Sequence, residues 1–61
     1  MNYVIYHEFG KRKLTTQDNY DAIIQDASKV VDLSNFASDE SAKEWLVSNT
    51  WAAENQIIII R

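Results

Sequence analysis

Four consecutive isoleucines at residues 57–60 restrict the possible folds of this chain more than any other feature. Because β-branched side chains favour strands and the run has the length of a strand, the segment is predicted to be a β-strand. Successive side chains of a strand point to opposite faces of the sheet. Ile57 and Ile59 therefore share one face and Ile58 and Ile60 share the other, so this strand is apolar on both faces.

The chain has 61 residues, which is enough for a single domain (residues 1–61) made of a sheet and one layer of helices. One face of such a sheet stays uncovered, so we expect an apolar patch there that needs another chain to bury it. An alternative is that Trp51, Phe36 and the loop of residues 49–55 fold over the patch within one chain; we favour association. The residues predicted to contact a partner are Ile58, Ile60, Tyr6, Val4 and Trp51.

The rest of the chain predicts two strands and two helices. Aromatic and β-branched residues indicate a strand over residues 3–9, and Gly10 favours a tight turn into a strand over residues 13–16. Apolar spacing predicts a helix capped by Asp18 and reaching about residue 31, although residues 29–33 are compatible with helix or strand. Ser38 is predicted to cap a second helix that ends near Asn49.

The expected fold is therefore α+β with the order β-β-α-α-β. In this arrangement two helices pack on one face of a three-stranded, mainly antiparallel sheet.

The composition argues against several function classes. The chain has no cysteine and only one histidine, His7, and no recognisable catalytic motif accompanies it, so we expect no enzyme, no metal and no cofactor. The longest apolar run has four residues, and the first residues lack the pattern of a secretory signal. We therefore expect a cytoplasmic protein without a membrane segment.

Single-stranded nucleic-acid binding is an alternative function. Lys11, Arg12 and Lys13 lie next to strand aromatics, which are the components of a stacking platform with phosphate-binding cations. The whole chain, however, has nine acidic and six basic residues and a net charge of −3. Because phosphate binding depends on clustered positive charge, a nucleic-acid partner is less expected than a protein.

The favoured function is that of a small protein-binding module, whose partner is either another protein or a second copy of the chain. A narrower hypothesis is that the acidic residues between Asp32 and Glu54 imitate nucleic acid on a basic surface of a target protein. The favoured interpretation of these acids is an ordinary solvated helix face. In its size and lack of cysteine the chain resembles small proteins of bacteriophages and bacterial mobile elements. This resemblance implies a regulator or inhibitor that acts by protein–protein contact.

Overall fold

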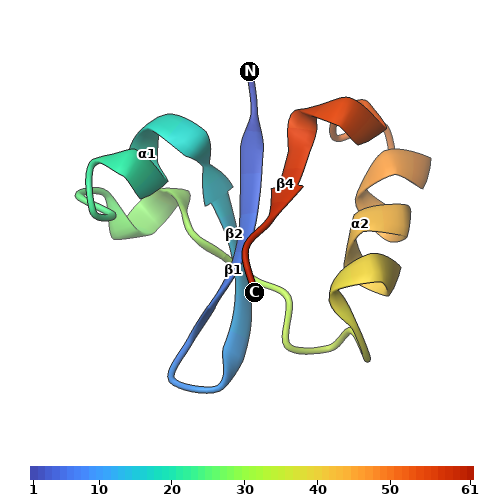
Figure 1. The fold of residues 1–61 in the computed structure, drawn as a ribbon, viewed down its shortest axis with the longest axis horizontal. Helices are drawn as coiled ribbons and strands as arrows, with labels where there is room; N and C mark the ends of the chain where they lie inside the picture. Colours follow the sequence, from blue (N-terminus) through green and yellow to red (C-terminus); the bar gives the residue numbers. More distant parts are fainter.

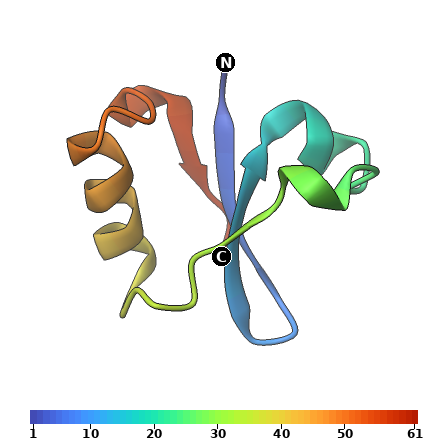
Figure 2. The ribbon, with the colours of Figure 1, turned by 180° about the vertical axis from the view of Figure 1, so that it is seen from behind.

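The computed structural model describes all 61 residues as a four-stranded mixed sheet with helices on opposite sides of it (Figures 1 and 2). The strand order across the sheet is β3-β2-β1-β4. The elements in chain order are β1 (Tyr3–Glu8), β2 (Lys11–Thr16), α1 (Gln17–Asp21), the 3-10 turn η1 (Ala27–Lys29), β3 (Val31–Asp32), α2 (Asp39–Ser48), the 3-10 turn η2 (Glu54–Gln56) and β4 (Ile57–Ile59).

A two-residue turn joins β1 to β2. Phe9 and Gly10 have φ angles of +52° and +75°, and Glu8 pairs with Lys11 across the hairpin. Positive φ at both central residues is the geometry of a type I′ turn, whose twist matches that of the flanking strands. The predicted turn at Gly10 is confirmed, and the second strand begins two residues earlier than expected.

The α+β class is confirmed, but the predicted three-stranded, mainly antiparallel sheet is wrong in two respects. β3 adds a fourth strand that pairs antiparallel with β2, so Val31 and Asp32 in the ambiguous segment form a strand. β4 lies parallel to β1, with Tyr3 opposite Ile57. A parallel pair requires a long crossover connection, and the segment containing β3 and α2 provides it.

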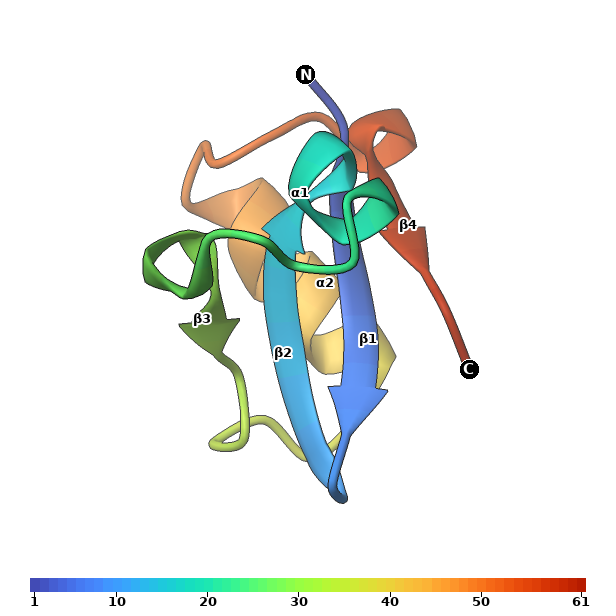
Figure 3. The same ribbon diagram turned by 90° about the vertical axis from the view of Figure 1, so that its left-hand side faces the viewer.

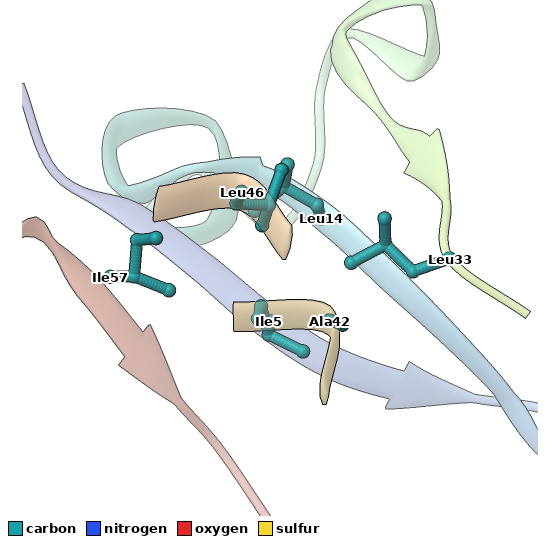
Figure 4. Packing of buried hydrophobic residues seen from close by; sticks show 6 residues of the cluster. All are labelled: Ile5, Leu14, Leu33, Ala42, Leu46 and Ile57. Carbon is teal, nitrogen blue, oxygen red and sulfur yellow. The ribbon is translucent and has the colours of Figure 1, made fainter. Parts of the chain in front are cut away.

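The helices cover opposite faces of the sheet, so the expectation that both pack on one face is also wrong. On one face, α2 contributes Ala42 and Leu46 to the main core (Figure 4). The strand residues of this core are Ile5, Leu14 and Ile57, and Leu33 completes it. On the other face, Tyr20 of α1 packs against Tyr6 of β1 with a ring-centroid distance of 5.3 Å.

The helix predicted to reach about residue 31 ends as α1 at Asp21, and Thr16, not Asp18, caps its N-terminus. The buried Asn19 accounts for the early end. Its side-chain amide donates to the carbonyl of Asp26, and its side-chain carbonyl accepts from the Asp26 N–H, at 2.9 and 3.0 Å. These bonds turn the chain back towards α1, because an asparagine side chain can replace backbone partners in a turn.

The predicted start of the second helix is confirmed. Ser38 accepts a hydrogen bond from the N–H of Ser41 at 3.1 Å, and the Ser41 hydroxyl accepts one from the Ser38 N–H, which completes a capping box. The resulting α2 has 10 residues and is the longest helix. No helix in the structure combines the length and apolar character that a membrane crossing requires.

Candidate protein-contact surface

The face of the sheet that carries α1 is only partly covered. The parallel register places Ile58 beside Val4, and the Ile60 N–H donates to the Ile5 carbonyl at 2.9 Å, which continues the strand pairing. Ile58 and Ile60 each remain 36% exposed. Val4 and Tyr6 are buried on this face, at 1% and 4% exposure, so in this structure they do not offer the partner-binding surface expected of them.

The reason for this difference is the position of α1. Figure 3 shows α1 and the loop after it in front of β1 and β2, whereas β4 lies beside them without a covering element. The prediction placed α1 on the other face, where it could not have buried Val4 and Tyr6. The outer face is therefore apolar as expected, but only its β4 part is accessible.

Two further isoleucines extend the accessible apolar area. Ile23 is 90% exposed in the loop after α1, and Ile24 beside it is half-buried. Tyr20, Ile23 and Ile24 line a shallow groove of about 400 Å³ together with three residues of β1, which are Tyr6, His7 and Glu8. We call the set of accessible residues on this face the isoleucine surface; its members are Tyr20, Ile23, Ile24, Ile58 and Ile60.

The backbone at Ile23 and Ile24 is strained. Their φ angles are +57° and +51°, in the left-handed region that β-branched residues rarely adopt. Such strain persists where the surrounding structure imposes it, and it is concentrated at functional sites. Sequence reasoning missed this feature because the spacing of both residues fits an amphipathic helix.

Trp51 does not cover the isoleucine surface. Its ring packs edge-on against that of Tyr3, with 6.3 Å between the ring centroids, and the backbone N–H of Trp51 donates to the Leu46 carbonyl at 3.0 Å. Tyr3 packs against the main core on the α2 side of the sheet, so the expected role of Trp51 in the same patch as Ile58 does not fit this geometry. Trp51 is 44% exposed on a separate surface.

Phe36 also lies on the α2 side. Its ring is 5.7 Å from that of Trp45, and it packs against the main core. The alternative in which Trp51 and Phe36 fold over the patch within one chain is therefore not the arrangement found.

The cations predicted for nucleic-acid binding are brought together at the hairpin, but two of the three form ion pairs. The Arg12 guanidinium donates from Nε to Asp39 Oδ1 at 2.6 Å, and its side chain is only 15% exposed. Lys13 Nζ donates to Glu8 Oε1 at 2.9 Å, and this bond raises the pKa of Lys13. Lys11 has no ion pair, so a single free cation remains at this position.

Asp39 is the centre of a polar cluster that sequence reasoning missed. Besides Arg12, His7 Nε2 lies 2.8 Å from Asp39 Oδ1, and Arg12 also donates to the Phe36 carbonyl. The bond from Arg12, followed by that from His7, lowers the pKa of the Asp39 carboxyl. The cluster joins the hairpin to the first turn of α2, and no local pattern could indicate it, because its members are 27 and 32 residues apart from Asp39.

The structure contains no group of three or more acidic or histidine side chains arranged to hold a metal ion. Comparison of the chain with protein families, with curated proteins and with solved structures finds no match.

Proposed function

We propose that this chain is a small, non-catalytic protein-binding module that uses the isoleucine surface to contact its partner. The observation that carries the proposal is Ile23, a large apolar residue that is 90% exposed on a strained backbone. In water this residue contributes almost no burial and the backbone conformation costs free energy. Contact with another protein would bury the side chain, and the free energy of this burial would offset the cost of the backbone conformation.

The remainder of the isoleucine surface supports the same proposal. Ile58 and Ile60 lie on the same face of the sheet as Tyr20, whose ring packs on Tyr6 next to the groove. Exposed apolar side chains gathered on one face of a small protein are typical of interaction sites. Tyrosine is enriched among the residues that dominate interface energy.

A role as a regulator or inhibitor, as in the small proteins of bacteriophages and mobile elements, fits a domain of this size. Single-stranded nucleic-acid binding has less support. The Arg12 and Lys13 side chains already pair with Asp39 and Glu8, and freeing them for phosphate would break both ion pairs.

Site-specific photo-crosslinking in the organism of origin tests the proposal. A benzophenone amino acid at position 23 should capture a protein, whereas the same probe at Glu44, exposed on α2 across the sheet, should not. The captured protein is then purified, and its affinity is measured for the wild-type chain and two variants. Ile23→Asp keeps a residue that tolerates positive φ and should weaken binding by about tenfold or more.

The control variant Ser48→Asp changes an exposed position of α2 and should bind as the wild type does. Equal affinity of the wild type and Ile23→Asp would overturn the assignment of the isoleucine surface. Capture of nucleic acid instead of protein would overturn the proposed function.

A further inference from the structure

β4 forms an open edge of the sheet, because β1 is its only neighbour. The Ile60 N–H points towards β1, where it donates to the Ile5 carbonyl. Backbone groups of alternate residues in a strand point in opposite directions, so the N–H and C=O of Ile59 and the C=O of Ile57 point outwards. The Ile57 N–H is already bonded to the Glu54 carbonyl in η2.

The charges that flank β4 favour one direction of pairing at this edge. Glu54 precedes the strand, and the exposed Arg61, which in the single chain pairs with Glu40 of α2, follows it. When two copies pair antiparallel, each Arg61 lies towards the end where the partner has Glu54. A parallel pairing would instead bring like charges together, which is unfavourable.

We propose that the occupant of the β4 edge is a second copy of this chain, paired antiparallel with Ile59 opposite the partner's Ile59. This names the partner of the β4 part of the isoleucine surface, so it rests on the proposed function. The register matches every outward donor with an acceptor. Each Ile59 N–H donates to the partner's Ile59 carbonyl, and each Arg61 N–H donates to the partner's Ile57 carbonyl.

The same register also joins the apolar side chains. A two-fold axis perpendicular to the sheet keeps corresponding faces on the same side, so Ile58 lies opposite the partner's Ile60 and Ile60 opposite the partner's Ile58. Both side chains are 36% exposed in the single chain and lose solvent contact in the pair. The contact is self-complementary in hydrogen bonding, charge and apolar area, which explains why a second copy fits the edge.

Sedimentation equilibrium of the whole chain tests this inference, from micromolar concentration to about 1 mM. We expect a monomer–dimer equilibrium in this range. Chemical synthesis allows N-methylation of Ile59, which removes the outward N–H and places a methyl group at the edge without touching the bonds to β1. This change should weaken dimerisation by about tenfold or more.

Two side-chain variants complete the test, with circular dichroism to confirm folding. Ile60→Asp should weaken dimerisation because two aspartates would enter the apolar contact, whereas Ser48→Asp, at an exposed position of α2, should leave it unchanged. A monomer at about 1 mM, or a dimer insensitive to both N-methylation and Ile60→Asp, would overturn the inference. A monomer whose captured partner still depends on Ile23 would leave the proposed function standing and refute only the second copy.

Discussion

Replacement of Ile23 by glycine should stabilise the protein, although it removes a large apolar side chain. The left-handed conformation costs a residue with a Cβ about 1–2 kcal/mol, and glycine adopts it without this penalty. Glycine loses about 0.5–1 kcal/mol through the greater freedom of the unfolded chain. Because Ile23 is 90% exposed, the lost burial is only about a tenth of the 1.5–3 kcal/mol of a fully buried side chain.

The sum of these contributions is a gain of about 0.5 kcal/mol, which corresponds to a rise of roughly 2–4 °C in Tm for a domain of this size. Urea unfolding followed by tryptophan fluorescence measures the change, since Trp45 and Trp51 report on the α2 side of the sheet. Ile23→Ala is the matched control: it removes almost as much side chain but keeps the Cβ. If Ile23→Ala is as stable as Ile23→Gly or more so, the backbone at this position is not strained and the reasoning fails.

Substitutions at three further contacts test what defines the fold, each by urea unfolding, with Asp18→Ala as a control. Asn19→Ala should cost about 2–3 kcal/mol, because it leaves the turn groups of Asp26 without their partners; a loss below about 0.5 kcal/mol would contradict the role of Asn19 in ending α1. Ser38→Ala should cost about 1 kcal/mol through loss of the capping box, whereas Asp18→Ala, at the position that is not the cap, should cost less. The lowered pKa of Asp39 means that its stabilising effect is complete above its unfolded pKa of 3.8 and is lost as the pH falls through the folded value. Asp39→Asn should therefore lower the free energy of unfolding at pH 7. Between about pH 5 and pH 2 the free energy of unfolding should decrease less in the variant than in the wild type, and an equal decrease in both would refute the ion cluster.

Local signals in the sequence predicted the elements that local contacts determine. Gly10 occupies a position with a φ of +75°, which its lack of a Cβ permits. Ser38 caps α2 because its hydroxyl bonds to an N–H only three residues away. The isoleucine run forms a strand because its β-branched side chains fit a pleated surface.

The predictions that were wrong concern contacts between residues that are distant in the sequence. The parallel position of β4 beside β1 depends on pairing between residues 3 and 57, and the apolar pattern within either strand does not indicate which strand it pairs with. The same applies to the ion cluster of Asp39, whose arginine was interpreted as a free cation. The wrong placement of α1 also affects the predicted contact residues. Ile58 and Ile60 are accessible, but Val4 and Tyr6 are buried under α1, which the prediction placed on the other face of the sheet.

One cause connects the short helix with the surface proposed to bind a partner. At 1.5 Å per residue, the five residues of α1 span about 7.5 Å, whereas strands of a sheet are about 4.8 Å apart. A helix of this length and about 10 Å in diameter covers two strands, β1 and β2, and leaves β4 bare. The turn that Asn19 imposes also puts Ile23 and Ile24 in the loop instead of on a longer helix that could cover more of the face. The position of Ile23 and Ile24 in the exposed loop therefore follows from the hydrogen bonds of Asn19, and a sequence change that continued α1 past Asp21 would move both isoleucines onto the helix.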